Sequence, residues 1–378
     1  MKNKPIFLFI IGEDSYFLSH RLPAAKAAVK AGFNVVVLAT NTGRSEEIER
    51  LGIGFISAKT KRGDRGIFKI ISAIQEYKFV NKKIKPKVIQ HVGIKNVLLG
   101  MAACLFDSKP AVVNAINGTG FLFANNDKKT LLYRSVVMFL LLVLSWLRES
   151  TFLFQNQYDL NTFKNWKIHW KQTLLVSGSG VDVDKFCLTS LPNLQPKIVI
   201  GIACRLLNTK GIREAVSAME ILSKRNINVH LMIAGSMDLA NPASLNQRDL
   251  NRINKCENIE LLGYIHDIKT FWSKCHIGAL LSYGGEGIPM SLMQPASMGR
   301  PLIATNVAGN RSVISDNISG YIVAPKEPEE FADAVEKMCA KPEKLTDMGL
   351  QSHQLIHEKG LTNKDITNCL LPLYAAFL

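Results

Sequence analysis

Short apolar runs alternate with amphipathic stretches of helical period along nearly the whole chain of 378 residues. This alternation is typical of βαβ units, in which a helix returns the chain to the starting edge of a parallel sheet. We therefore expect an α/β fold of two doubly wound, Rossmann-like domains facing each other across a cleft, with ligands at the carboxyl ends of the strands. The expected strands are Ile6–Ile11, Val35–Ala39, Val88–His91, Val112–Ile116 and Thr151–Phe154 in the first half, and Lys197–Ala203, His230–Ala234, Ile259–Leu262, His276–Leu281 and Pro301–Ala304 in the second.

The domain boundaries follow from length and composition. The chain is too long for one ordinary core and suits two. Residues 187–196 include two prolines and few strong helix or strand formers, which predicts a linker there. The N-terminal domain is then 1–186, the C-terminal domain is 197–356, and the segment 357–378 holds a terminal helix that is a candidate to cross back to the first domain.

Positive charge is concentrated in the first half. The whole chain carries 46 Lys and Arg against 31 Asp and Glu, and residues 1–190 hold 27 of the basic and 13 of the acidic side chains. A basic surface of this kind favours an anionic membrane or nucleic acid, or it merely keeps the protein in solution. No nucleic-acid-reading module is recognisable, so we expect no nucleic acid partner.

The most apolar run is Val136–Leu147, flanked by Arg134 and Arg148. Twelve helical residues span about 18 Å, less than the roughly 30 Å of a bilayer core, so the run is not expected to cross a membrane. It is either a buried helix or an apolar surface that docks on a membrane. Seven scattered cysteines without metal-ligand spacing indicate a reducing compartment. We expect a cytoplasmic protein, peripheral on the inner face of the cytoplasmic membrane.

One candidate site lies in the segment 201–211. A buried strand ends there at Ala203, a loop follows, and a helix begins just after Gly211. Arg205 and Lys210 fall on this loop, beside the backbone N–H groups at the helix start. Two cations at such a place suit a diphosphate, with the guanidinium as a planar fork and the ammonium as a point charge. The alternative is a pair of solvated surface cations.

A second candidate site lies on the segment 283–294, where three glycines surround the carboxylate of Glu286 and Pro289 opens a helix. Gln294 follows about 7–8 Å further along that helix, at ~1.5 Å per residue. This separation fits the distance from a hexose across a diphosphate to a ribose. The alternative is a helix cap and an amide that faces the core.

Together these segments resemble the family-4 glycosyltransferases, which are retaining enzymes of GT-B fold. The first part of the chain looks like the branch that builds bacterial surface polysaccharides and lipopolysaccharide. The matching segments are Arg205–Gly211, Glu286–Pro289, Gly299–Pro301, Thr305–Asn310 and Asn317–Val323, and upstream Phe17–Pro23, Asn117–Phe121, Phe154–Asn156 and Gly178–Asp182.

The resemblance implies transfer, with retention, of a hexose or N-acetylhexosamine from a nucleotide diphosphate sugar, most often a UDP-sugar, to a polyprenyl-diphosphate-linked saccharide. Glu286 would position the sugar, while Arg205 and Lys210 would stabilise the departing diphosphate, so no metal cofactor is expected. The donor-binding residues would be Arg205, Lys210, Gly285, Glu286, Gly287, Ile288, Pro289 and Gln294, and the candidates on the acceptor side are His20, Asn117 and Gly118.

The sequence departs from the family pattern at two positions. Gln294 stands where a second Glu is usual, and Asn117 stands where many relatives have His. Gln294 keeps open a degenerate GT-B scaffold or binding protein without transfer activity, and a transferase with a soluble acceptor is a further alternative. Asp182-Val183-Asp184 resembles a metal-binding Asp-x-Asp signature, but it lies near the linker and away from any phosphate loop, so we expect it to hold no metal.

Overall fold

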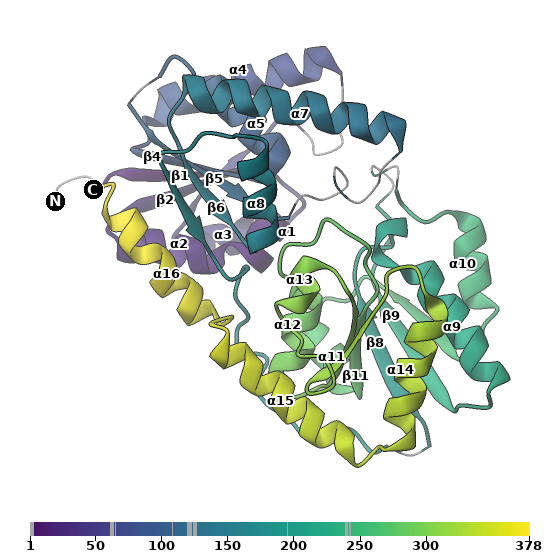
Figure 1. Cartoon of the computed structure of the whole chain (residues 1–378). Coiled ribbons are helices and arrows are strands. Elements are labelled where there is room, and N and C mark those ends of the chain that lie inside the picture. The colour runs from purple at the N-terminus through teal and green to yellow at the C-terminus, as the bar shows by residue number, and fades with distance from the viewer. Residues whose placement is uncertain are drawn as a thin grey trace. The chain divides into compact units, whose positions relative to one another are not determined.

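The computed structural model describes residues 4–60, 64, 66–107, 109–118, 123, 127–194, 196–238, 241 and 243–378 (Figure 1). The chain forms two compact units. The first comprises Met1–Gly180 together with Asn363–Leu378, and the second comprises Val181–Thr362. Both are parallel α/β structures, so the prediction of two doubly wound domains is confirmed.

The first unit is built on a seven-stranded parallel sheet in the order β3-β2-β1-β4-β5-β6-β7. The chain starts in the middle, winds to one edge, returns and winds to the other, as in a dinucleotide-binding fold. The strands are β1 (Ile6–Glu13), β2 (Asn34–Thr40), β3 (Gly54–Ser57), β4 (Val88–Val92), β5 (Ala111–Ile116), β6 (Thr151–Phe154) and β7 (Gln172–Leu175).

Helices cover both faces of this sheet because successive side chains of a strand point to opposite sides. Phe7 and Phe9 of β1 pack with one helix layer, and Leu8 and Ile10 pack with the other. The first layer contains α1 (Asp14–His20), α2 (Leu22–Lys30), α3 (Ser45–Arg50) and the C-terminal α16 (Asn363–Ala375). The second contains α4 (Ile67–Ile84), α5 (Ile94–Ala103), α7 (Lys128–Leu147) and α8 (Gln157–Asn165).

The second unit repeats this plan with six parallel strands in the order β10-β9-β8-β11-β12-β13. The strands are β8 (Ile198–Ala203), β9 (Val229–Ala234), β10 (Ile259–Gly263), β11 (Ile277–Leu280), β12 (Leu302–Thr305) and β13 (Gly320–Val323). The helices are the 3₁₀ turn η1 (Asn208–Lys210), α9 (Ile212–Lys224), α10 (Gln247–Asn254), α11 (Ile268–Ser273), α12 (Met290–Ser297), α13 (Ala308–Arg311), α14 (Pro328–Ala340) and α15 (Lys344–Glu358).

The segment 187–196, predicted as a linker, is held against the second unit. Arg300, 1% exposed, donates to the backbone oxygens of Thr189 (2.8 Å) and Ser190 (3.2 Å). The division between the units falls after Gly180, six residues before the predicted end of the first domain. Through these bonds to Arg300, Thr189 and Ser190 of this segment lie against the second unit.

Helix α7 is longer than the sequence suggested. It begins at Lys128, where the side chain of Asp127 caps it by accepting from Thr130 N–H (3.1 Å), and it runs for 20 residues. Within the described residues it is the one helix long and apolar enough to cross a membrane, and 28% of its most apolar stretch is buried inside the protein. The helix is therefore longer than the twelve residues expected from the sequence, because it also includes Lys128, Lys129 and Arg134. The expectation that it is too short to cross a membrane was wrong about its length.

Candidate functional site

Glycine packing brings two loops of the second unit together at the carboxyl edge of its sheet. Gly211 ends the loop after β8 with φ +72°, and a Cβ there would lie 2.2 Å from the carbonyl oxygen of Leu281, at the end of β11. Only glycine tolerates both the backbone conformation and this contact. The N–H of Tyr283 donates to the carbonyl of Thr209 (3.2 Å), which ties the two loops directly.

This contact places Lys210 beside Glu286, 76 residues later in the chain. The ammonium Nζ donates to Oε1 of the carboxylate, and the two side chains are only 18% and 13% exposed. An ion pair in such a partly buried place is screened less than a surface pair. The structure thus brings together two of the three residues predicted to carry the chemistry.

The loop that carries Glu286 is fixed by its glycines. Gly284 and Gly285 have φ angles of +149° and +73°, which turn the chain sharply before Glu286. The carbonyl oxygen of Gly287 lies against α13, where a Cβ on Gly309 would come within 1.5 Å of it. Ile288 and Pro289 are buried, and Pro289 is the residue that precedes α12.

A buried polar network supports this loop from below. Thr305, at the end of β12, donates its hydroxyl to the carbonyl of Ser282. The side-chain amide of Asn310 donates to Thr305 O (3.0 Å) and Thr305 Oγ1 (3.1 Å). Buried and hydrogen-bonded groups of this kind rigidify the structure around them. The loops after β11 and β12 are therefore held as one piece.

Arg205 lies at the same edge but does not join the Lys210–Glu286 pair. Its Nη1 donates to Oδ2 of Asp238 (2.7 Å), on the loop after β9, and its side chain is 44% exposed. The sequence placed Arg205 on the correct loop but gave no sign of Asp238 as its partner, because the two are joined only through the pairing of β8 with β9.

Gln294 is half-buried on α12, and its carboxamide oxygen accepts from Nε1 of the buried Trp272 (3.1 Å). The bond fixes the orientation of the carboxamide, whose second oxygen lone pair and NH2 group can still bond a ribose hydroxyl. Trp272 was not singled out from the sequence, where it appears only as an apolar residue of α11.

Cys204 lies on the same loop as Lys210. Burial raises the pKa of its thiol to about 12, so at pH 7 it is neutral and unsuited to act as a nucleophile. Among the residues that the structure describes, no group of three or more His, Cys, Asp or Glu side chains is placed to hold a metal. Asp182 uses Oδ1 to accept from the N–H of Lys185 (3.0 Å).

The candidates on the acceptor side lie in the first unit and meet around one tyrosine. His20 stacks on the ring of Tyr16, with centroids 4.2 Å apart. Asn117, which follows β5, donates its side-chain amide to the hydroxyl of Tyr16 (3.3 Å). Gly118 has φ +94°, while Thr119, Gly120 and Phe121 lie outside the described residues. Tyr16 was missed because its spacing in the sequence resembles that of an ordinary helix residue.

The site in the second unit therefore offers a cation and a carboxylate in fixed positions, with a second cation on the neighbouring loop. An ammonium and a guanidinium are suited to diphosphate oxygens. A carboxylate beside them is suited to accept from the hydroxyls of a sugar.

Two family models match the chain, and together they span most of it. The model described as glycosyl transferase 4-like matches residues 7–156, and the model described as glycosyl transferases group 1 matches residues 197–341. These two ranges correspond to the sheets of the first and second units.

Relatives and solved structures agree. The capsular polysaccharide biosynthesis glycosyltransferase CapM of Staphylococcus aureus is 21% identical over 100% of this chain and 98% of its own length. The N,N'-diacetylbacillosaminyl-diphospho-undecaprenol alpha-1,3-N-acetylgalactosaminyltransferase of Campylobacter jejuni is 22% identical over 87% of this chain and 90% of its own.

Among solved structures, sucrose-phosphate synthase from Thermosynechococcus elongatus superimposes with a TM-score of 0.81 at 15% identity, over 98% of both chains. Anabaena HepE in complex with UDP and glucose gives 0.75 at 15% identity, over 97% of this chain and 98% of its own. The GT-B fold predicted from the sequence is confirmed. The chain belongs to the glycosyltransferases that join a glycosyl transferase 4-like domain to a group 1 domain.

Proposed function

We propose that this glycosyltransferase moves a hexose or N-acetylhexosamine from a UDP-sugar to a lipid-linked saccharide in surface polysaccharide synthesis, with retention and without a metal. The observation that carries the donor half of the proposal is the Lys210–Glu286 pair at the carboxyl edge of the second sheet. The CapM and Campylobacter relatives support the pathway and the diphospho-undecaprenol acceptor, and the UDP complex of HepE supports the nucleotide.

In this proposal the second unit holds the donor. Lys210, with Arg205 beside it, takes the diphosphate, and Glu286 accepts from the hydroxyls of the sugar ring. The acceptor hydroxyl bonds to the anomeric carbon on the face from which the diphosphate departs, the anomeric carbon–oxygen bond breaks, and the hydroxyl proton passes to the leaving phosphate. The cations stabilise the charge that builds on that phosphate, which is the role a divalent metal plays in other transferases.

The acceptor half of the proposal rests on an apolar face of the first unit. Helices α4 and α7 both pack on α5, and each leaves large side chains exposed, with Phe68 85%, Phe139 60% and Trp146 66% exposed. Lysines accompany them, among them Lys69 and Lys78 on α4 and Lys128 and Lys129 on α7. Exposed apolar side chains among basic ones are typical of a surface that lies on an anionic bilayer.

A donor screen tests the transfer. The purified protein is incubated with UDP- and GDP-sugars and a polyprenyl-diphosphate-linked saccharide, and the released nucleotide is measured. We expect release from one UDP-sugar only when acceptor is present, no effect of EDTA, and a product whose anomeric configuration, read by NMR, matches that of the donor. Strong inhibition by EDTA with rescue by Mn²⁺ would contradict the metal-free mechanism.

Flotation with anionic liposomes tests the membrane surface. We expect association at low salt, weakened at high salt, and lost on combining Phe68→Ser, Phe139→Ser and Trp146→Ser. Each replaced side chain gives up about 1.5–3 kcal/mol of burial, so binding should fall roughly a hundredfold or more. Leu350→Ser, a change of an exposed apolar residue in the second unit, is the control and should leave flotation unchanged. Failure of the unmodified protein to float at low salt removes this part of the proposal.

Gln294, which stands where the family usually has a second Glu, motivates a second candidate, a GT-B scaffold that binds without transferring. Calorimetry separates the two. Binding of a UDP-sugar by the unmodified protein supports the transferase. A protein that ignores every nucleotide sugar, and gains binding only with Gln294→Glu, supports the scaffold.

A further inference from the structure

Arg21 is a buried arginine with two guanidinium nitrogens that have no partner among the described residues. It lies at the junction of α1 and α2 and is 5% exposed. Its Nε and Nη2 atoms are buried and make no hydrogen bond within the described part of the chain. Leaving a charged donor buried and unpaired costs several kcal/mol by the usual estimates. These nitrogens call for an acceptor from outside the described part of the chain.

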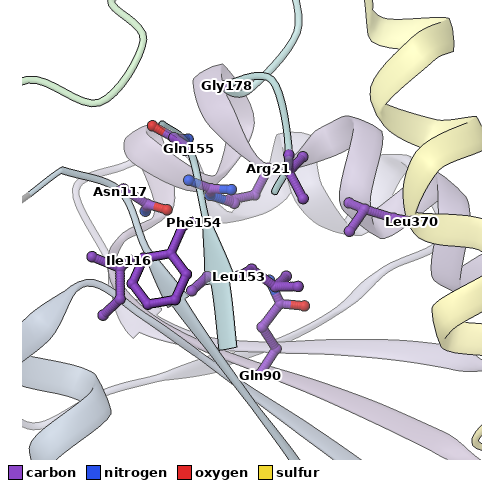
Figure 2. Close-up of a pocket in the computed structure, with 11 residues that line it drawn as sticks. Arg21, Gln90, Ile116, Asn117, Leu153, Phe154, Gln155, Gly178 and Leu370 are labelled. Carbon is purple, nitrogen blue, oxygen red and sulfur yellow. The ribbon is translucent and has the colours of Figure 1, made fainter. Parts of the chain in front are cut away.

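The guanidinium opens into a pocket of the first unit. The pocket lies at the carboxyl ends of β5, β6 and β7, with Gln90 from the middle of β4, and its empty space, open solvent at the mouth included, is about 240 Å³. Figure 2 shows the guanidinium lying between the side chains of Asn117 and Gln155, with Gln90 below. In a doubly wound sheet this edge is where ligands bind.

The other buried side chain with an unsatisfied group in this pocket is also a donor. Gln90 is fully buried, and its Oε1 accepts from the hydroxyl of Tyr374 on α16 (2.6 Å). Its Nε2 has no partner among the described residues. The unmet groups of Arg21 and Gln90 are therefore all N–H donors, and the group that satisfies them must be an acceptor of hydrogen bonds.

We propose that Arg21 and Gln90 form a binding site for a phosphate or diphosphate group in the first unit, separate from the diphosphate site of Lys210. A planar guanidinium matches the geometry of phosphate oxygens. The group comes from the diphosphate of the lipid-linked acceptor, so this inference rests on the proposed function. Free diphosphate has the same chemistry and is distinguished by the test.

The test uses the full chain carrying Arg205→Ala and Lys210→Ala, so that the second unit does not bind the probe. Calorimetry measures binding of inorganic pyrophosphate and of farnesyl diphosphate. We expect farnesyl diphosphate to bind and Arg21→Met to weaken it about tenfold or more, the loss of a charge-assisted hydrogen bond. Gln90→Glu keeps the acceptor for Tyr374 but adds a negative charge, and it should abolish binding. This variant also serves if Arg21→Met folds poorly.

Arg148→Met is the matched control. Arg148 is a half-buried arginine of the same unit that does not line the pocket. Its Nη2 donates to the carbonyl of Pro110 (2.6 Å), and its Nε, like that of Arg21, is buried without a partner in the described residues. Because it lies outside the pocket, its loss should leave binding unchanged. Equal binding of pyrophosphate and farnesyl diphosphate, lost with Arg21→Met, supports the site but assigns it to free diphosphate. Equal affinity of the parent and both pocket variants overturns the proposal.

Failure of the proposed function is recognised separately. UDP binding to the chain with native Arg205 and Lys210 tests the donor site. UDP binding should be unaffected by Arg21→Met, whether or not the first unit binds farnesyl diphosphate.

Discussion

Among the described residues, each unit of this glycosyltransferase buries one arginine, and the two are held in opposite ways. Arg300 in the second unit is 1% exposed, and all three of its guanidinium nitrogens donate to oxygens of the chain, at Cys275, Thr189, Met298 and Ser190. Arg21 in the first unit is 5% exposed, and two of its nitrogens have no partner in the described residues. A satisfied buried arginine holds the fold together, whereas an unsatisfied one is available for a ligand.

The largest expected effect is on the free energy of unfolding, which should respond differently to replacement of the two arginines. Arg300→Met leaves several buried carbonyl oxygens without donors and should lower the free energy of unfolding by about 3–5 kcal/mol. Arg21→Met removes an unpaired buried charge and should leave the free energy of unfolding unchanged or raise it, by up to about 4 kcal/mol, in the absence of ligand. Urea unfolding followed by tryptophan fluorescence measures both. Equal destabilisation by the two changes would break the comparison.

The second prediction concerns activity and the paired cation Lys210. Lys210→Ala should lower kcat about 10²–10³-fold, the usual effect of removing one group that stabilises transition-state charge. Arg205→Ala should cost less, roughly tenfold, because that side chain is 44% exposed and its charge is partly screened by water. Arg213→Ala is the matched control. It breaks the Arg213–Asp249 pair of the same unit and should leave kcat unchanged. An unchanged kcat with Lys210→Ala would remove Lys210 from the mechanism.

The sequence predicted more of the second unit's site than of the first unit's. Lys210 and Glu286 were predictable because each lies on a loop directly after a strong apolar strand, and β8 and β11 are neighbours. Asp238 and Trp272 were not, because their contacts depend on side-chain paths across strands. Nothing in the sequence marks Arg21 as unpaired, since that state depends on which residues from three strand ends meet around it.

The fold was also harder to predict from the sequence at the edges of the two sheets. The three strands that were missed, β3, β7 and β13, each have four residues and lie at the edge of a sheet. Their side chains are partly exposed, so they lack the continuous apolar run that marks a central parallel strand. The edge strand β10 was predicted as Ile259–Leu262, because its sequence is mostly apolar, whereas the three shorter edge strands gave no such signal.

A third prediction tests whether the loop of Glu286 depends on glycine packing. Gly309→Ala should lower the free energy of unfolding by about 1–3 kcal/mol, because the new methyl group would lie against the backbone of Gly287. The shift of that loop should also weaken binding of a UDP-sugar, measured by calorimetry. Gly12→Ala in the first unit is the control, since a Cβ there meets nothing within 4 Å. Unchanged donor binding by Gly309→Ala would mean that the loop adjusts without cost to the site.

The smallest expected effect is on how stability depends on pH, and it concerns two buried histidines, one in each unit. His276 in the second unit uses both ring nitrogens, since Nδ1 accepts from Val199 N–H (2.9 Å) and Nε2 lies 3.2 Å from the carbonyl of Asn193. His91 in the first unit is fully buried and uses one, Nδ1, which lies 2.9 Å from Oδ1 of Asn114, while its Nε2 has no partner in the described residues. Burial lowers the pKa of His91 to about 4, and burial also lowers the pKa of His276.

His91 should therefore make the protein less stable in acid. Between about pH 6.5 and pH 4 the unfolded chain holds a proton on this residue and the folded chain does not, so the free energy of unfolding falls as the pH falls. For one proton the slope approaches about 1.4 kcal/mol per pH unit. Urea unfolding at pH 7, 6 and 5 gives the slope of the free energy of unfolding against pH. This slope should be smaller by up to this amount in His91→Gln, because glutamine can still donate to Asn114 but does not titrate. The same slope with and without His91 would mean that the buried ring takes up its proton in the folded state. Water would then reach the Nε2 atom of His91 even though the ring is buried.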